Sequence, residues 1–429
     1  MDKPHIAVLG AGPMGLAAAY QLVCDGYSPI VFEADDRVGG MAASFDFNGL
    51  TIERYYHFHC TSDVDLFTLL RELQLEHKLH WVPTKMGYYV CGRVQPWGNP
   101  LALLSLKGLG LFDKIRYGLH AFLSTKRDDW TSLDKIEATK WIKRWVGVRA
   151  FDVLWKQLFE LKFYDLAYNL SAAWVWSRIR RVGRSRYNIF KEKLGYLDGG
   201  SDVVLKAMAS EINKRGGEIH LSCPVTRVII EGNAIRGIEA GGSFHPFDVV
   251  ISTVPLPYVP KLIPNLPAEI IQRYRSVQNI AVVCVIVKLS RPVTENFWLN
   301  VNDPEMDIPG IIEYTNLRTL GQHVVYVPFY MPAEHPKYSE PDAVFVRKVT
   351  RYLIKINPDL KESDILDIRA SRYRHAQPVC TPGFSQLLPP IKLPIPGLFV
   401  ADTSFYYPED RGISESVCLA RKMARMAVS

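Results

Sequence analysis

The first residues of the chain contain the feature that most restricts its fold. A short apolar run, residues 6–9, leads into a turn that holds Gly10, Gly12 and Gly15, and a helix-like stretch follows from Leu16. The first glycine allows a tight turn, the second lets the backbone approach a pyrophosphate, and the third lets the helix pack closely on the strand. The pattern predicts a dinucleotide site at the N-terminus. The alternative is a strand, turn and helix whose glycines serve packing alone.

An acidic residue supports the dinucleotide interpretation. A second strand, predicted over residues 27–32, ends at Glu33, where a carboxylate would accept hydrogen bonds from the ribose hydroxyls. A further pair, Gly39-Gly40, follows, and backbone without side chains can pass close to a ligand bulkier than NAD.

At these residues the chain resembles the FAD-containing amine oxidase superfamily, which includes protoporphyrinogen oxidases, phytoene-type desaturases and, more distantly, UDP-galactopyranose mutases. The resemblance implies FAD as cofactor, held noncovalently because no cysteine occupies a position where the superfamily tethers its flavin. The residues that it assigns to FAD here are Gly10, Gly12, Pro13, Met14, Gly15, Glu33, Ala34, Arg37, Gly39, Gly40 and Met41. Met41 stands where amine oxidases commonly carry Arg, which argues against amine oxidation.

Two later segments resemble the places where the superfamily's chain returns to the cofactor. A strand around Val225 is expected to lie along the adenine, and Asp402, at the end of another strand, to bind the ribityl or pyrophosphate region. Asp402 as a simple turn residue is the alternative. Arg411, Gly412 and Ile413 would open the last helix, whose N–H groups would face the pyrimidine edge of the flavin.

These returns predict an α/β fold in two domains. A discontinuous, Rossmann-like FAD-binding domain is expected over residues 1–65, 195–259 and 365–429. A mixed α+β substrate domain would consist of a helical insertion, 66–194, and a strand-rich insertion, 260–364.

Catalytic candidates lie in two segments. The polar and aromatic stretch 53–63 resembles the segment of UDP-galactopyranose mutases whose histidine approaches the flavin. His57 or His59 would then donate to flavin N5 or O4, or move a proton, because histidine titrates near neutral pH. Structural hydrogen bonding by both histidines is the alternative. Arg374 lies where the superfamily's chain crosses toward the flavin and is the third candidate, with Gln377 as a further pocket residue.

Substrate-binding candidates are arginines and tyrosines. Residues 178–186 contain five arginines, and planar guanidinium groups suit a phosphate or carboxylate. The same cluster could instead face anionic lipid, together with the apolar stretch 101–112, or form a solvated basic helix end. The predicted substrate contacts are Arg178, Arg181, Tyr314, Tyr330 and Tyr373.

Composition narrows the remaining classes. A net charge of +7 over 429 residues, without a lysine-rich tail, fits an anionic substrate or a membrane surface better than a nucleic acid. Seven scattered cysteines without a C-x-x-C pair predict a reducing compartment and no metal site. The apolar run 280–287 is too short to span a membrane and predicts a buried strand. The first strand begins so early that no secretory signal is expected, and we predict a cytoplasmic protein with peripheral membrane contact as an option; the oligomeric state stays open.

The sequence therefore predicts an FAD-dependent oxidoreductase. The expected reaction is hydride transfer, as a dehydrogenation, desaturation or reduction, on a bulky small-molecule substrate that is anionic or lipid-linked. The first alternative is a flavin-dependent sugar mutase without net redox change, in which the arginines hold a nucleotide-sugar diphosphate. The second is a chain that binds FAD structurally and serves as a partner subunit.

Overall fold

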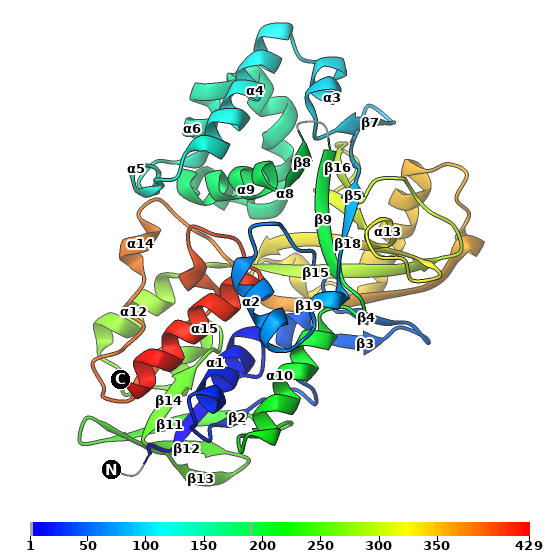
Figure 1. Cartoon of the computed structure of the whole chain (residues 1–429). Coiled ribbons are helices and arrows are strands. Elements are labelled where there is room, and N and C mark those ends of the chain that lie inside the picture. Colours follow the sequence, from blue (N-terminus) through cyan, green and yellow to red (C-terminus); the bar gives the residue numbers. More distant parts are fainter. Residues whose placement is uncertain (1–2, 189–190) are drawn as a thin grey trace.

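The computed structural model describes residues 3–188 and 191–429, and its two lobes are visible in Figure 1. The lower lobe is built on a five-stranded parallel sheet with the order β10-β2-β1-β14-β20. Its strands come from widely separated segments: β1 Ile6–Leu9, β2 Ile30–Phe32, β10 Glu218–His220, β14 Val249–Ser252 and β20 Leu398–Val400. The carboxyl ends of the two central strands, β1 and β14, therefore meet at one edge of the sheet, where ligands of parallel sheets bind.

Apolar sequence explains why this sheet lies at the centre of its lobe. All four residues of β1 and of β14 are buried, as expected for parallel strands that are covered on both faces. Helix α1 (Pro13–Cys24) packs on α10 (Asp202–Lys214) and on the last helix, α15 (Ile413–Val428). In Figure 1 the blue α1 and the red α15 lie side by side, so the two ends of the chain share one layer.

Two small antiparallel sheets complete the lower lobe. One contains three strands, β11 Val225–Glu231, β12 Ala234–Ala240 and β13 Ser243–Pro246. The other pairs β3 (Ser44–Asp46) with β4 (Thr51–Glu53). Helix α2 (Val64–Glu72) packs against α15.

The second lobe contains a seven-stranded mixed sheet with the order β19-β15-β18-β17-β16-β6-β7. Strand β15 (Asn279–Leu289) is buried along its whole length between its two antiparallel neighbours, which confirms the strand predicted over 280–287. The other strands are β6 Met86–Val90, β7 Arg93–Trp97, β16 Trp298–Asn302, β17 Gly310–Glu313, β18 His323–Pro332 and β19 Ile365–Pro378.

Helices gather at the top of this lobe (Figure 1). They are α3 Pro100–Ser105, α4 Leu111–Lys126, α5 Thr131–Asp134, α6 Ala138–Val146, α7 Val148–Phe151, α8 Gln157–Phe163 and α9 Ala172–Arg184. Below them, β5 (Leu79–Thr84), β8 (Arg186–Asn188) and β9 (Lys191–Leu197) form a three-stranded sheet. The remaining helices are α11 Val259–Leu262, α12 Ala268–Ser276, α13 Asp342–Ile356 and α14 Phe384–Leu387. Among the described residues, none of the helices combines the length and the apolar character that crossing a bilayer requires.

The α/β fold class is confirmed, but the chain crosses between the lobes later than the sequence predicted. Strand β19 pairs along β15 from Leu289 back to Asn279 and so belongs to the seven-stranded sheet, although the prediction gave everything after 364 to the nucleotide lobe. The boundary at 195 likewise falls inside β9. The pairing of β19 and β9 thus continues past residues 364 and 195, while the division into two domains stays a prediction.

Candidate active site

The glycine turn after β1 has the geometry of a ligand cradle. A Cβ atom on Gly15 would lie 1.8 Å from the carbonyl oxygen of Gly10, so only glycine lets α1 pack this closely on the strand. A Cβ on Gly12 would meet no heavy atom of the described residues within 4 Å. Gly40, at a φ of +54°, brings its backbone against Gly12. Gly12 therefore borders open space that Gly40 helps to enclose, while Pro13 and Met14 begin α1 beside it.

Glu33 ties this turn to the second strand. One of its carboxylate oxygens accepts a 2.6 Å hydrogen bond from the Ala11 N–H, and the other accepts one of 2.9 Å from the Asp35 N–H. Its carbonyl oxygen accepts from the N–H of Cys223, two residues before Val225. Each carboxylate oxygen can accept a further bond, so Glu33 can hold the turn and still receive a ribose hydroxyl.

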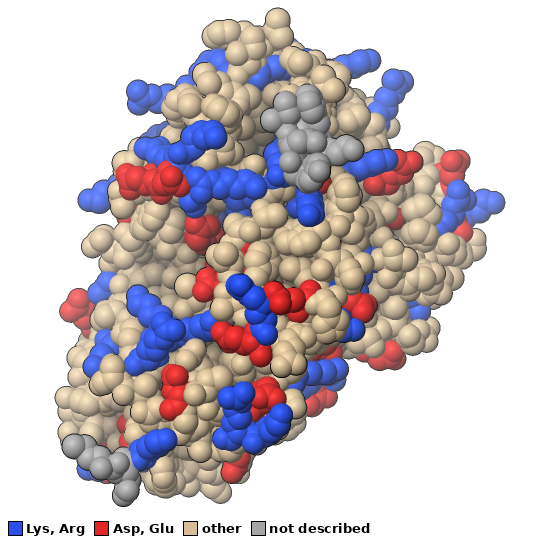
Figure 2. Space-filling view, viewed as in Figure 1, with Lys and Arg blue, Asp and Glu red and all other residues tan. Residues whose placement is uncertain are grey.

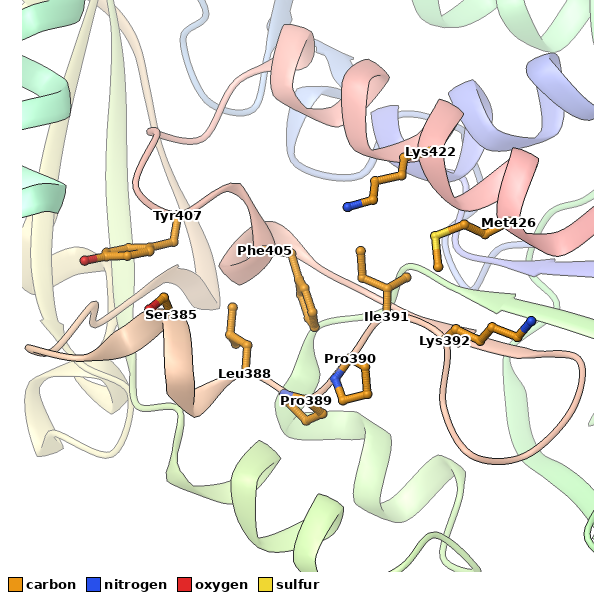
Figure 3. A pocket seen from close by; sticks show the side chains of 10 residues that line it. All are labelled: Ser385, Leu388, Pro389, Pro390, Ile391, Lys392, Phe405, Tyr407, Lys422 and Met426. Atoms are coloured by element: carbon orange, nitrogen blue, oxygen red, sulfur yellow. The ribbon is translucent and has the colours of Figure 1, made fainter. Parts of the chain in front are cut away.

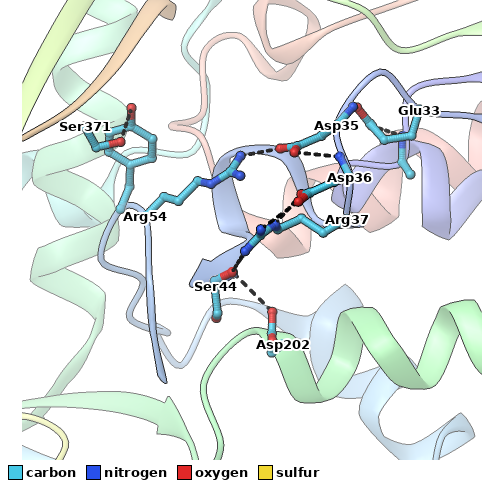
Figure 4. Close-up of polar contacts among 10 residues, drawn as sticks. Glu33, Asp35, Asp36, Arg37, Ser44, Arg54, Asp202 and Ser371 are labelled. Atoms are coloured by element: carbon cyan, nitrogen blue, oxygen red, sulfur yellow. Dashed lines mark hydrogen bonds and ion pairs between the residues drawn. The ribbon is translucent and has the colours of Figure 1, made fainter. Parts of the chain in front are cut away.

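The other residues predicted around the turn have different surroundings. The Arg37 guanidinium is 2.6 Å from Asp36 and donates to the carbonyl of Ser44 (Figure 4). Ala34 has an exposed side chain, Gly39 has a φ of +114°, and Met41 packs on the core at the β3–β4 sheet. Arg37 therefore fixes the loop around Gly39 and Gly40 rather than pointing a free cation at a ligand.

The C-terminal segment returns to the same edge of the sheet. Asp402 is buried at the end of β20 and accepts 2.8 Å bonds from the N–H groups of Leu256 and Ser404. Burial raises the pKa of its carboxyl group. The turn role that the sequence left open is thus present, since Asp402 caps the short helix at Thr403–Tyr406. Gly412 and the buried Ile413 begin α15 directly beyond, and Arg411 donates to the carbonyl of Ala376.

Several polar atoms at this edge are buried without a partner among the described residues. Both the oxygen and the nitrogen of the Gln377 amide lack one, although Gln377 is only 1% exposed, and so do Nδ1 of His57, Oε2 of Glu415 and Oγ of Ser404. Buried polar groups in folded proteins are almost always hydrogen-bonded. Four orphaned groups on the segments that surround the glycine cradle fit a bound group rich in donors and acceptors, as a dinucleotide flavin is.

Beside them lies a group of half-buried charges that we call the cationic cluster: Lys162 of α8, Arg178 of α9, Asp410 and Arg411. The Arg178 guanidinium is 2.6 Å from Asp410 and stacks 3.1 Å from the centre of the Trp174 ring. The Lys162 ammonium lies 5.0 Å from the centre of the Tyr330 ring, and no carboxylate among the described residues forms an ion pair with it. Three cations thus share one carboxylate.

The charges of the cluster alter one another's proton affinity. Burial and the neighbouring Arg178 and Arg411 lower the pKa of Lys162 to about 7. Burial opposes ionisation of Asp410, but the surrounding cations outweigh it and hold the pKa near 2. Tyr56 and Tyr330 feel the same charges, and burial raises the pKa of both phenols, which therefore stay protonated. The cluster carries a net positive charge at and below neutral pH.

The two histidines predicted as catalytic candidates have different surroundings in the structure. His59 is buried and exchanges two 2.8 Å backbone hydrogen bonds with Gly195, while its Nδ1 lies 3.8 Å from Asp63, so it holds strand β9 in place. His57 has the orphaned Nδ1 described above, and burial, helped by His59, lowers its pKa to about 4. His57 is therefore neutral at physiological pH.

Three other candidates lie elsewhere than expected. Arg374 is 40% exposed and pairs with Glu334 at 3.2 Å on the surface, so it is not at the site. Tyr314 packs in the core against Tyr326 at 1% exposure, which gives it no free face for a substrate. Arg181 pairs at 3.1 Å with the buried Asp63 rather than with a pocket.

The remaining candidates do lie near the cationic cluster. Arg178 and Tyr330 are parts of its wall, and Tyr373, against Tyr55, borders the region between Arg411 and Glu33. Lys162, Asp410 and Tyr56 were missed by the sequence reasoning. The sequence feature that could have indicated this site is a lone lysine within an aromatic stretch of a predicted helix, Phe159 to Tyr164.

A groove of about 360 Å³ opens elsewhere, between α15 and the segment after α14 (Figure 3). Leu388, Pro390, Phe405 and Met426 line it together with two lysines, Lys392 and Lys422. None of the residues of the cationic cluster or of the glycine turn contributes to its wall. It is a separate surface feature.

Comparison with known proteins agrees with this geometry. The chain is 23% identical over 321 residues to the 15-cis-phytoene desaturase of Synechococcus elongatus, covering 68% of this chain and 66% of the desaturase. It is 31% identical over 155 residues to protoporphyrinogen oxidase 2 of Arabidopsis thaliana, covering 35% of this chain and 30% of the oxidase. The chain thus spans less than two thirds of the length of these curated relatives.

Solved structures share the whole fold. A protein from Exiguobacterium sp. 255-15, assigned as a protoporphyrinogen oxidase, superposes with a TM-score of 0.75 over 99% of both chains at 17% identity. Reduced UDP-galactopyranose mutase superposes with a TM-score of 0.72 at 16% identity, over 98% of this chain and 95% of the mutase. At such identities the likeness is one of fold.

The sequence profile of one family extends over residues 15–407, nearly the whole of the two-lobed structure. The FAD cofactor predicted from the glycine turn agrees with this match, as does the oxidoreductase class. The chain belongs to the flavin-containing amine oxidoreductase family.

Proposed function

We propose that the protein removes a hydride from a bulky small molecule that carries an anionic group, and that the cationic cluster holds that group. The observation that supports this most strongly is the excess of partly buried positive charge. Asp410 is engaged by Arg178 at 2.6 Å, which leaves Lys162 without a carboxylate partner among the described residues. An unpaired buried charge is costly, and a ligand carboxylate or phosphate would neutralise it.

The desaturases and oxidases among the relatives support dehydrogenation as the reaction. FAD, when bound, supplies the hydride acceptor. The residues that would hold it are those of the glycine cradle, with Glu33 at the ribose and the first turn of α15 at the flavin ring. Gln377, whose amide is buried with both polar atoms unpaired, would receive its hydrogen bonds from the same group.

The side chains of the protein itself would orient the substrate, move a proton and exclude water. Lys162 and Arg411 would orient the anionic group, and the aromatic rings of Tyr330 and Trp174 would contact the apolar body of the substrate. His57, neutral at pH 7, could accept or release a proton at Nδ1 without a change of conformation. The protonated phenols of Tyr56 and Tyr330 would exclude water.

The cofactor position can be tested with Gly12→Val. The backbone at Gly12 has a φ of −69° and open space around its Cβ position, so the variant is expected to fold. A valine there would occupy pyrophosphate space, so the purified variant should lose the visible flavin absorption that the parent protein shows. Gly118→Val in α4, where the nearest atom is 3.8 Å away, is the matched control and should remain yellow. A folded Gly12→Val protein that retains its flavin would refute the placement.

The anion site can be tested separately, by titrating the FAD-loaded protein with benzoate and with neutral benzyl alcohol. Benzoate should perturb the flavin spectrum, and Lys162→Gln should weaken its binding about tenfold, the loss of roughly 1.4 kcal/mol. Lys107→Gln, at an exposed position outside the site, should have no effect. Equal binding of both ligands by the parent protein would contradict an anionic substrate and leave the cofactor assignment intact.

A sugar mutase remains the second candidate, because the positive charge that would hold a carboxylate could equally hold a diphosphate. The two are separated by electron balance. A mutase turns over repeatedly after one reduction of the flavin, whereas the proposed dehydrogenase consumes one acceptor molecule per turnover.

A further inference from the structure

Helix α4 of the upper lobe exposes apolar side chains to the solvent and buries polar ones. The outer face of α4 presents Leu111, Phe112, Ile115, Leu119 and Phe122, each between 49% and 70% exposed. Their spacing of three to four residues places them in one stripe along the helix. The inward face carries polar side chains instead, with His120 and Ser124 buried. The amphipathic pattern of α4 is thus inverted.

Neighbouring segments extend the stripe into a continuous surface. Leu101 and Leu104 of α3, which packs on α4, are 65% and 53% exposed. Trp145 at the end of α6 and Val148 at the start of α7 are also exposed, and both helices contact α4. We call this surface the α3–α4 patch. Scattered single apolar residues are normal on a protein surface, but a contiguous patch of this kind marks an interaction site.

The charges around the patch indicate what covers it. Residues 99–127 contain five basic side chains and a single acidic one, Asp113. Lys107, Lys126 and Arg144 are exposed, and none forms an ion pair with a carboxylate among the described residues. The upper part of the space-filling view shows blue Lys and Arg side chains set around tan surface (Figure 2). The partner must therefore offer an apolar interior and a negatively charged boundary.

We propose that the α3–α4 patch docks the protein on the surface of an anionic lipid bilayer. A helix with apolar side chains on one face and basic residues beside them lies in the membrane interface, with its apolar face among the acyl chains and its cations at the headgroups. A second copy of the chain fits less well, because two patches brought face to face would juxtapose like charges. The inference is independent of the proposed reaction, since none of the patch residues belongs to the cationic cluster.

The position differs from the one considered from the sequence. There the five arginines of residues 178–186 were the alternative lipid contact, with 101–112 as the apolar partner. In the structure Arg178 pairs with the half-buried Asp410 and Arg181 with the buried Asp63, while Arg180 and Arg184 pair with Asp128. The apolar half of that alternative stays in the proposal, and the basic half moves to the lysines and arginines around α4.

The test is co-sedimentation of the full, FAD-loaded protein with vesicles of phosphatidylcholine alone or mixed with phosphatidylserine. The protein should bind the mixed vesicles at least tenfold more strongly than the neutral ones, and rising salt should weaken that binding. Phe112→Glu combined with Ile115→Glu should reduce binding to mixed vesicles by tenfold or more. The flavin spectrum and the melting temperature show whether the variant stays folded.

Phe244→Glu is the matched control, because Phe244 is 55% exposed but lies on β13 in the other lobe, and this variant should bind like the parent protein. Equal binding of parent and α4 variant would overturn the proposal. So would a concentration-dependent dimer that Phe112→Glu disperses, which would make a second copy the occupant.

Discussion

Two helices of the upper lobe depart in opposite ways from the usual pattern of apolar side chains inside and charged side chains outside. Helix α9 turns Arg178 and Arg181 inward, while α4 turns leucine, isoleucine and phenylalanine side chains outward. The inward arginines each meet a carboxylate, the half-buried Asp410 or the buried Asp63. The outward apolar side chains meet nothing among the described residues that would shield them from water.

The two helices differ in where the contacts that compensate these side chains come from. For α9 the compensation comes from within the chain, from segments more than a hundred residues away in sequence, so α9 fastens the C-terminal segment to the helical lobe. For α4 the compensation must come from outside the chain. The first arrangement should therefore be sensitive to substitution and the second tolerant of it.

The largest effect is expected at the buried side of α9. Asp410→Asn removes the only carboxylate of the cationic cluster and leaves the Arg178 guanidinium buried and uncompensated. Removing one partner of a fully buried ion pair destabilises a protein by about 3–5 kcal/mol, and this pair, 21% and 31% exposed, should lose somewhat less, which denaturant unfolding would measure. Asp128→Asn is the control, because Asp128, in the loop after α4, is 76% exposed and pairs with Arg180 and Arg184 on the outer face of α9, where exposed pairs contribute little. If the two variants melted alike, the distinction between the faces of α9 would be wrong.

A smaller effect should separate the two sides of the α4 layer. Ile142→Ala in α6 truncates a fully buried side chain and should cost about 2–4 kcal/mol through lost burial and a residual cavity. Ile115→Ala, on the exposed stripe of α4, should change the free energy of unfolding by less than about 0.5 kcal/mol. Thermal unfolding of both variants without lipid checks this, and a comparable loss in both would show that α4 is covered after all.

The smallest effect concerns Lys162 and depends on pH. Its folded pKa of about 7 lies below the unfolded value of about 10.4. The unfolded chain therefore binds more protons between these values, and stability rises with pH across this window. Lys162→Met should be more stable than the parent below pH 7, by about 1–3 kcal/mol because the half-buried ammonium is partly screened, and equal to it above pH 10. An identical pH profile in both proteins would place Lys162 in ordinary solvent.

The sequence predicted the cofactor cradle because its parts are local. Three glycines, a strand and Glu33 lie within the first 33 residues, and their spacing alone determines the turn. The long strand β15 was equally readable from its unbroken apolar run. The contacts of residues 178–186 could not be predicted in this way. In a helix, Arg178 and Arg181 lie on a different face from Arg180 and Arg184, but the prediction treated all five arginines as one group.

The cationic cluster could not be assembled from the sequence at all. Its residues come from α8, from α9 and from the loop before α15, and only tertiary packing brings them together. Arg374, on β19, faces away from the cluster for a related reason. On a strand, neighbouring residues point to opposite sides, so the prediction that a segment crosses near the flavin does not determine which of its side chains faces the site.

The sharing of one layer by α1 and α15 has a consequence for biosynthesis. Residues near the start of the chain cannot gain their packing partner until residues 398–428 have left the ribosome, because β20 and α15 supply it. The sheet of the nucleotide lobe thus joins strands from residues 6–9 and 398–400, which are translated far apart in time. A nascent chain stalled before β20 should therefore expose to chaperones the apolar surface of α1 that α15 covers.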